Sequence, residues 1–127
     1  MKLDTARIFV SNVVRSKPFY QQILGLTMDV DGTEDGYFLL SSNGINIVVE
    51  NSEPVDETTG EPLVGRFTGL SFSVANIFET HNRLSTAGVE FLDPPEQQAW
   101  GGYIASFKDI DGNILTLVQS QPELLAV

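Results

Sequence analysis

The stretch that decides the fold is Ile8-Phe9-Val10-Ser11-Asn12, together with its counterpart Phe72-Ser73-Val74-Ala75-Asn76 in the second half of the chain. Each stretch is a short apolar run that ends in an asparagine, and each is followed by a helical segment that stops at a glycine, Gly25 or Gly88. Self-similarity at a constant offset indicates a repeated structural unit. Two copies are too few for a solenoid, so the repeat predicts one domain with pseudo-twofold symmetry.

Working outward, the period of the apolar residues and the turn signals predict four strands and one helix in each copy. The first copy is expected to hold strands Ala6–Val10, Leu26–Val30, Tyr37–Ser41 and Ile45–Glu50 and helix Arg15–Leu24. The second is expected to hold strands Leu70–Val74, Val89–Leu92, Tyr103–Lys108 and Ile114–Val118 and helix Ile77–Ala87. Each copy therefore reads βαβββ, and neither half can bury one face of its sheet alone.

The fold class predicted is α+β: a single domain over residues 1–127 in which two βαβββ repeats form a paired, curved, eight-stranded mixed sheet around a cleft. The first repeat covers about 3–50, a linker or flap 51–67, and the second repeat about 68–119. We expect the tail from Gln119 to fray or to make subunit contacts. The sequence leaves open whether the halves pair within one chain or are swapped between chains.

Composition limits the classes of partner. Seventeen acidic residues against seven basic ones give a net charge of −10, which opposes binding to nucleic acid. The chain has no cysteine, which excludes disulfides and thiolate chemistry. It also has no apolar run long enough to span a membrane and no apolar secretion segment. We therefore expect a cytoplasmic protein with a small-molecule ligand.

These residues resemble the vicinal-oxygen-chelate superfamily, which includes glyoxalase I, bleomycin-resistance proteins and extradiol dioxygenases. The resemblance rests on Ile8–Asn12, on Leu24-Gly25-Leu26, on Ala87–Phe91, on Trp100-Gly101 and on Phe107–Asn113, where Ile110 stands in place of a usual proline. It covers about residues 5–118. It implies the paired βαβββ fold, often as a homodimer that completes the pocket, with antibiotic resistance among the family's roles.

In metal-dependent members of that superfamily, four side chains in the cleft hold a divalent ion, and they are usually His, Gln or Glu. The matching positions in this chain are occupied by Thr5, Val48, Gly69 and Thr116. None supplies an imidazole or a carboxylate, and a valine and a glycine offer no side-chain donor. We therefore predict no metal and no other cofactor, although a divalent ion is the alternative.

Strand alternation and loop position select the candidate ligand-binding residues, which are Arg7, Phe9, Glu50, Ser71, Trp100 and Tyr103. A guanidinium at Arg7 needs a partner such as Glu50 or a ligand carboxylate. Trp100 is expected to stack on a planar ligand. No catalytic residue is identified.

Two classes of function follow. The first is a metal-free protein of the glyoxalase/bleomycin-resistance type that binds a small organic ligand, aromatic or antibiotic-like, in the cleft. The alternative is a metal-dependent lyase, isomerase or dioxygenase, similar to lactoylglutathione lyase. A third reading is metal-free enzyme chemistry in which Glu50 or Arg7 acts on a carbonyl or acidic substrate. The first reading fits the missing ligands best.

Overall fold

The computed structural model describes residues 1–120 and divides the chain into two compact units. Unit 1 comprises Met1–Arg66 together with the turn Ile110–Asn113, and the described part of unit 2 comprises Phe67–Asp109 and residues 114–120. The segment expected to be a linker thus belongs to unit 1 as far as Arg66. The last seven residues of the expected tail lie outside the described residues.

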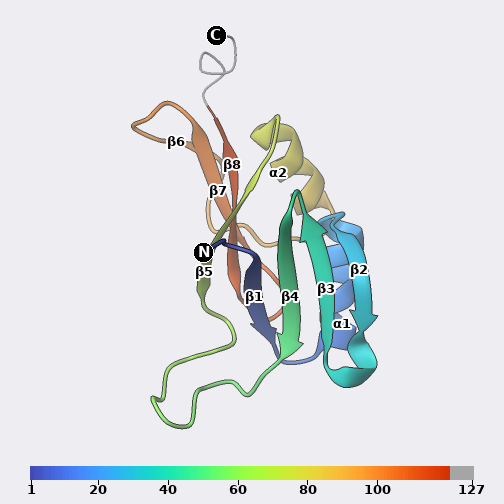
Figure 1. Cartoon of the computed structure of the whole chain (residues 1–127). Helices are drawn as coiled ribbons and strands as arrows, with labels where there is room; N and C mark the ends of the chain where they lie inside the picture. The colour runs from blue at the N-terminus through green and yellow to red at the C-terminus, as the bar shows by residue number, and fades with distance from the viewer. Residues whose placement is uncertain (121–127) are drawn as a thin grey trace. The chain divides into compact units, whose positions relative to one another are not determined.

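Unit 1 contains a four-stranded mixed sheet with the strand order β1-β4-β3-β2. Figure 1 shows these strands side by side, with α1 behind them. The strands are β1 (Thr5–Val10), β2 (Thr27–Gly32), β3 (Tyr37–Ser42) and β4 (Ile45–Asn51). β1 runs parallel to β4, and the other two pairings are antiparallel.

The helical segment of unit 1 differs from the predicted helix Arg15–Leu24. It begins earlier, as α1 (Val13–Pro18), and continues as the π-helix η1 (Phe19–Ile23); a 3-10 turn, η2 (Thr33–Asp35), lies before β3. The start is fixed by Asn12, whose side chain accepts hydrogen bonds from two backbone N–H groups of the first turn. The α-helical bonding ends at Pro18 because proline has no N–H to continue it. The predicted stop at Gly25 is confirmed, since this glycine has φ +73°.

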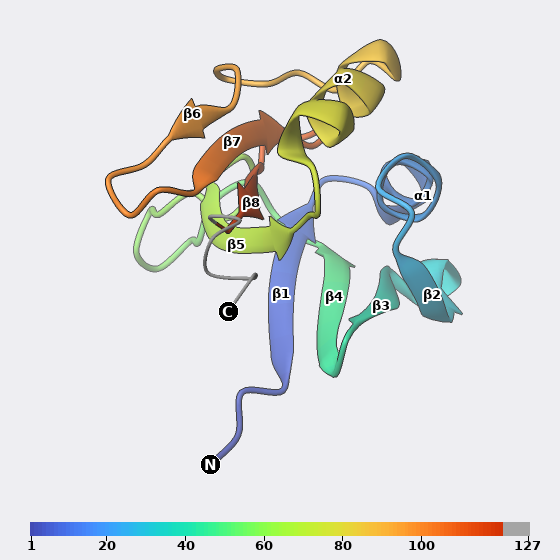
Figure 2. The ribbon, with the colours of Figure 1, turned by 90° about the horizontal axis from the view of Figure 1, so that it is seen from above.

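Unit 2 repeats the same arrangement with the strand order β5-β8-β7-β6. Its elements are β5 (Phe67–Ser73), α2 (Ile77–Thr86), β6 (Glu96–Gln97), β7 (Tyr103–Lys108) and β8 (Ile114–Gln119). β5 is parallel to β8, and β7 is antiparallel to both of its neighbours. Figure 2 shows α2 along one face of β7. The two βαβββ repeats and the α+β class are confirmed; the pairing of the sheets around a cleft stays a prediction.

One predicted strand of unit 2 was wrong, and the bounds of its other elements, except those of β7, differ by a few residues from the prediction. The strand expected at Val89–Leu92 is reduced to a single bridge between Phe91 and Phe107, and β7 pairs further along with Glu96–Gln97. Prolines 94 and 95 interrupt the ladder between them because they have no N–H to donate. The chain also stays in the sheet for longer than expected, because β8 runs to Gln119.

The core of each unit lies between its sheet and its helix. In unit 1 the buried side chains include Ile8, Val10, Tyr20, Phe38, Leu40 and Val49. In unit 2 they include Ile77, Leu84, Ala105, Phe107, Leu115 and Leu117. Alternation along each strand therefore sends one set of side chains into the core and the other to the opposite face, which we call the helix-free face of that unit. Within residues 1–120, no helix is long and apolar enough to span a bilayer.

Candidate functional site

β1 places its odd-numbered side chains on the helix-free face of unit 1. Ile8 and Val10 are buried beneath the helix, whereas Arg7 is exposed and Phe9 is partly exposed. This is the phase predicted from alternation. The register of the parallel pair sets Arg7 beside Val48 and Phe9 beside Glu50 on β4. The face therefore brings together three of the six predicted ligand-binding residues.

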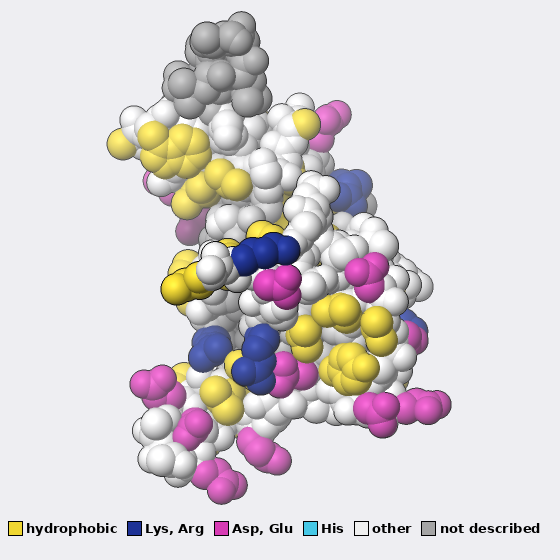
Figure 3. Space-filling model, in the orientation of Figure 1, with side chains coloured by type: hydrophobic (Ala, Val, Ile, Leu, Met, Phe, Trp, Pro, Cys, Tyr) yellow, Lys and Arg dark blue, Asp and Glu magenta, His cyan; other side chains and the backbone are white. Residues whose placement is uncertain are grey.

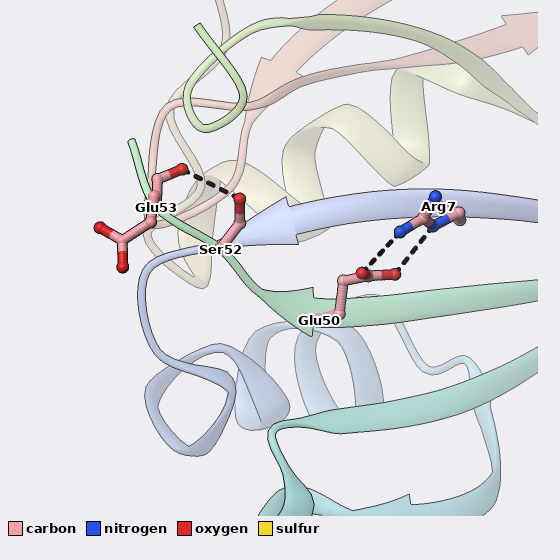
Figure 4. A network of polar contacts seen from close by, with 4 residues as sticks. All are labelled: Arg7, Glu50, Ser52 and Glu53. Carbon is pink, nitrogen blue, oxygen red and sulfur yellow. Dashed lines mark hydrogen bonds and ion pairs between the residues drawn. The ribbon is translucent and has the colours of Figure 1, made fainter. Parts of the chain in front are cut away.

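Arg7 and Glu50 form a two-pronged ion pair on this face (Figure 4). The Nε of Arg7 donates to Oε2 of Glu50 at 3.0 Å, and Nη2 donates to Oε1 at 2.8 Å. The carboxylate's hydrogen bonds and charge raise the pKa of Arg7 above its ordinary value. Each of the two carboxylate oxygens of Glu50 therefore accepts a hydrogen bond from Arg7.

Just beyond this pair, the chain leaves β4 still attached to β1. The backbone N–H of Ser52 donates to the carbonyl of Val10 at 3.0 Å, and the Ser52 hydroxyl donates to the carbonyl of Glu53 at 2.9 Å (Figure 4). The strand end that carries Glu50 is therefore held by backbone bonds on both of its sides. These backbone hydrogen bonds restrict the movement of the strand end that carries Glu50, and so of the ion pair with Arg7.

Phe9 lies under two guanidinium groups. The Cζ of Arg7 is 5.0 Å from the centre of the Phe9 ring, and the Cζ of Arg66 is 5.3 Å from it. Both distances fall in the range of cation–π contacts. Arg66 was missed by the sequence analysis because it lies in the irregular segment before β5, where no period assigns a side chain to a face.

A buried amide holds Arg66 against Phe9. Asn113 is 1% exposed, and its Nδ2 donates to the carbonyl of Phe9 at 2.8 Å. Its Oδ1 accepts the backbone N–H groups of Gly65 at 2.8 Å and Arg66 at 3.2 Å. Gly65 has φ +79°, and a Cβ there would meet the carbonyl of Asp111 at 3.0 Å. The backbone of the turn that carries Arg66 is thus fixed by its hydrogen bonds to Asn113, and position 65 in it favours glycine.

Apolar side chains lie on the same face as the charged cluster formed by Arg7, Glu50 and Arg66. Leu39 and Val48 are cross-strand neighbours on the helix-free face and are partly exposed. Figure 3 shows basic and acidic side chains side by side over β1 and β4, with hydrophobic side chains over β3 and β4. This face therefore offers charge, an aromatic ring and aliphatic surface within one sheet.

The helix-free face of unit 2 has a different chemistry. Ser71 pairs with Thr116, and Thr116 pairs with Ser106, so three hydroxyl side chains lie in one row across β5, β8 and β7. The hydroxyls of Ser106 and Thr116 are 2.9 Å apart and share a hydrogen bond. Ser71, a predicted ligand-binding residue, is the exposed member of this row. The row is small and uncharged.

The two predicted aromatic residues of unit 2 lie elsewhere in that unit. Tyr103 packs against Phe78 of α2, with ring centres 5.2 Å apart, so it lies on the helix side and not beside Ser71. Trp100 is 49% exposed in the turn before β7, and its indole lies over Gly102. Residues of β7 alternate, so Tyr103 shares its side with the buried Ala105 and Phe107, and its assignment to ligand binding stays a prediction.

The four positions that match the metal ligands of related proteins do not fit a metal. Thr5 and Gly69 are exposed, Val48 is aliphatic, and Thr116 is buried with its hydroxyl bonded to Ser106. In the described part of the chain, no group of three or more His, Asp or Glu side chains is placed to hold a metal ion. These four side chains thus supply neither an imidazole nor a carboxylate, which are the usual side-chain ligands of zinc and other transition-metal ions.

Comparison with known protein families identifies the family to which the chain belongs. The family model described as the glyoxalase/bleomycin resistance protein/dioxygenase superfamily matches residues 2–117. The chain belongs to this superfamily. The resemblance inferred from the sequence is therefore confirmed over nearly the whole chain.

Solved structures of this glyoxalase superfamily show the same fold. A member from Sphaerobacter thermophilus DSM 20745 is 30% identical with a TM-score of 0.76, and the match covers 94% of this chain and 98% of that one. TnmS3, an antibiotic-binding protein from Streptomyces sp. CB03234, is 25% identical with a TM-score of 0.75, over 95% and 97% of the two chains. A lactoylglutathione lyase from Agrobacterium tumefaciens is 12% identical with a TM-score of 0.72, over 93% and 92%. The similarity to the lactoylglutathione lyase shows a shared fold and nothing more.

Proposed function

We propose that this glyoxalase-superfamily chain is a binding protein that holds a small, planar organic ligand without a resident metal ion. The observation that carries the proposal is the helix-free face of unit 1, where Phe9 lies under two guanidinium groups and next to aliphatic surface. Aromatic rings and a few fixed polar groups are typical of small-molecule sites. The likeness to an antibiotic-binding protein at 25% identity supports the same class of ligand.

The charges of this face support binding rather than catalysis. Glu50 is tied to Arg7 by two hydrogen bonds, so neither group is presented to a substrate as a free acid or base. His81, the chain's one histidine, lies on α2 with its ring 4.4 Å from that of Phe91. The four positions of the family's metal ligands supply no nitrogen donor. We therefore propose sequestration of the ligand, in the cytoplasm, as the role.

The test has a metal arm and a ligand arm. Purified protein is incubated with nickel, zinc, manganese or ferrous iron, desalted and analysed for metal, and we expect far less than one ion per chain. Planar aromatic compounds, with bleomycin among them, are then screened by thermal shift, where a ligand at a hundred times its Kd adds about 2.7 kcal/mol of stability. One tightly held ion per chain, with a matching rise in melting temperature, would overturn the metal-free proposal.

A matched pair of variants tests whether a ligand found in the thermal-shift screen binds to unit 1. Phe9→Ala removes the ring from the helix-free face and is expected to abolish the thermal shift. Phe78→Ala removes an equally large ring from α2 in unit 2, where it is 48% exposed, and should leave the shift intact. Equal losses in the two variants would contradict the placement of the ligand on unit 1.

We also propose that the protein is a homodimer, since the superfamily resemblance implies that two copies complete the binding site. Light scattering coupled to size exclusion gives the mass directly, to be compared with 13.9 kDa for one chain. A monomer at micromolar concentration would overturn this part of the proposal.

A further inference from the structure

The guanidinium of Arg66 is the feature that the proposed function leaves unexplained. No carboxylate of residues 1–120 lies within ion-pair distance of it, whereas Lys2, Arg7, Lys17 and Lys108 each have such a partner. The chain carries seventeen acidic residues against seven basic ones. An unpaired arginine held in place on such an acidic molecule is a candidate for binding an anion from outside the chain.

The backbone of Arg66 is held by a buried side chain, and its guanidinium contacts the Phe9 ring. Asn113, almost fully buried, bonds the Arg66 N–H on one side and the Phe9 carbonyl on the other. The guanidinium itself lies over the Phe9 ring at 5.3 Å, and its five N–H donors stay uncommitted to any carboxylate of the described chain. An anion-binding group with a pre-set position loses less entropy on binding than a freely moving side chain.

The neighbouring charges set the charge of the ligand. Arg7 is neutralised by Glu50 through two hydrogen bonds, so the cluster of Arg7, Glu50 and Arg66 carries one net positive charge. A second negative charge on the ligand would meet the carboxylate of Glu50 and the acidic surface of the chain. One carboxylate is the group that a single uncommitted guanidinium matches best, since the two can form parallel hydrogen bonds.

We propose that the ligand of unit 1 is an aromatic monocarboxylate, with its carboxylate on Arg66 and its ring against Phe9 and the adjoining aliphatic surface. This inference rests on the proposed function and adds to it the chemical class of the ligand. Phe9 supplies the apolar contact, and Leu39 and Val48 extend it along the sheet.

The experiment compares 2-naphthoate with 2-naphthamide, which has the same ring but no charge, by isothermal titration calorimetry. We expect 2-naphthoate to bind at least tenfold more tightly, because a hydrogen bond to a charged group contributes more than a neutral one. Raising the sodium chloride concentration should weaken the acid and leave the amide unchanged. Acetate tests the carboxylate without a ring and should bind more weakly than 2-naphthoate.

Three variants assign the effect. Arg66→Ala should reduce the affinity for 2-naphthoate about tenfold and leave that for 2-naphthamide unchanged. Arg66→Lys keeps the charge and loses the paired hydrogen bonds, so an intermediate affinity is expected. Arg15→Ala is the matched control, because Arg15 on α1 is also exposed and also has no carboxylate partner in residues 1–120.

The outcomes separate the two proposals. Equal binding of acid and amide, unaffected by Arg66→Ala, would overturn the carboxylate inference and leave the binding protein standing. Binding of neither compound would overturn the carboxylate inference as well, and the wider aromatic screen would then decide the proposed function on its own. A loss of affinity in Arg15→Ala equal to that in Arg66→Ala would show a general effect of surface charge and would also overturn the inference.

Discussion

Units 1 and 2 share one hydrogen-bonded framework and differ in the face that it presents. In each unit an asparagine caps the helix, Asn12 in the first and Asn76 in the second. In each, a side-chain amide from the end of the last strand accepts the first helical N–H: Asn51 bonds Val13 at 2.8 Å, and Gln119 bonds Ile77 at 2.7 Å. The helix is thus tied to the sheet in the same way twice.

The helix-free faces of the two units have little chemistry in common. In unit 1 an ion pair lies beside an aromatic ring, whereas the row Ser71, Thr116 and Ser106 of unit 2 consists of hydroxyl side chains. The framework decides where side chains point, and the residues at those positions decide what can bind. The repeat therefore accounts for the fold but not for the function, which has to be argued from each face separately.

The largest expected difference between the units concerns their aromatic cores. The ring of Phe38 packs at a tilt against that of Tyr20, with ring centres 6.1 Å apart, and both side chains are fully buried. Phe107 lies 5.4 Å from Phe91, which is partly exposed. Replacing a buried phenylalanine by alanine costs about 3–5 kcal/mol of unfolding free energy. We expect Phe38→Ala near the top of that range and Phe107→Ala near the bottom, because partly exposed neighbours can collapse into the cavity.

Urea denaturation followed by circular dichroism measures both values. Val14→Ala, at a residue 64% exposed on α1, serves as the control and should change the free energy by less than about 0.5 kcal/mol. A larger loss from Phe107→Ala than from Phe38→Ala would contradict the comparison.

The next effect concerns a glycine beneath an aromatic ring, which occurs once in each unit. A Cβ on Gly32 would lie 2.4 Å from the ring of Tyr37 and would meet nothing else within that distance. A Cβ on Gly102 would lie 1.8 Å from the indole of Trp100 and 2.4 Å from the backbone oxygen of Gln119. A ring can swing away, but a strand backbone cannot. Gly102→Ala should therefore cost about 1–3 kcal/mol, and Gly32→Ala under about 1 kcal/mol.

The fluorescence of Trp100, the chain's one tryptophan, gives a second readout for this pair. Gly102→Ala should shift its emission because the indole has to leave the glycine. Gly32→Ala should leave the emission unchanged. An unshifted spectrum together with full stability in Gly102→Ala would show that the indole does not cover this glycine.

The sequence predicted the framework well because its signals are local. The asparagine that ends each apolar run, the glycine that ends each helix and the alternation along β1 all act within a few residues, and the structure confirms them. The predicted strand at Val89–Leu92 was wrong because its ladder depends on where β7 lies and on prolines 94 and 95. Helix periodicity also gave no sign of the change from α to π bonding after Pro18.

The candidate site was predicted less completely because its parts are distant in sequence. Alternation placed Arg7, Phe9 and Glu50 on one face, and the ion pair between the first and the last of these is confirmed. The guanidinium of Arg66 lies over the same ring, its backbone N–H is bonded by Asn113, and no local pattern in the sequence links these residues. The assignments of Trp100 and Ser71 to ligand binding stay predictions.

Substitutions at the helix caps test whether the capping asparagine contributes the same stability in both units. The side chain of Asn12 accepts from Val14 at 2.9 Å, and that of Asn76 accepts from Phe78 at 3.1 Å. Replacing either asparagine by alanine should cost about 1 kcal/mol, since one or two helical N–H groups lose their partner. Asn12→Asp and Asn76→Asp preserve the acceptor and should retain most of the stability. Thermal unfolding of the four variants decides the point: a cost confined to one unit would show that the two caps are not equivalent.

The smallest expected effect concerns one surface ion pair from each unit, Lys17–Asp31 in unit 1 and Lys108–Glu90 in unit 2. In unit 1 the Nζ of Lys17 is 2.6 Å from Asp31, and that contact, together with hydrogen bonds from Thr33, lowers the pKa of Asp31 to about 2. In unit 2 the pair Lys108–Glu90 is looser, at 3.8 Å. A carboxyl group whose pKa is lower in the folded chain than in the unfolded one stabilises the fold above the unfolded value and loses this contribution as the pH falls through the folded value.

Asp31→Asn should therefore lower the melting temperature at neutral pH, and its difference from the unsubstituted chain should shrink between about pH 4 and pH 2. Glu90→Gln is the matched control, and its difference should be small, because an exposed pair at 3.8 Å contributes little. Titration of the Asp31 carboxyl by carbon-detected NMR measures the pKa itself. A value near 4 would show that Lys17 does not hold this carboxylate in solution, and the two units would then be alike in their surface pairs as well as in their framework.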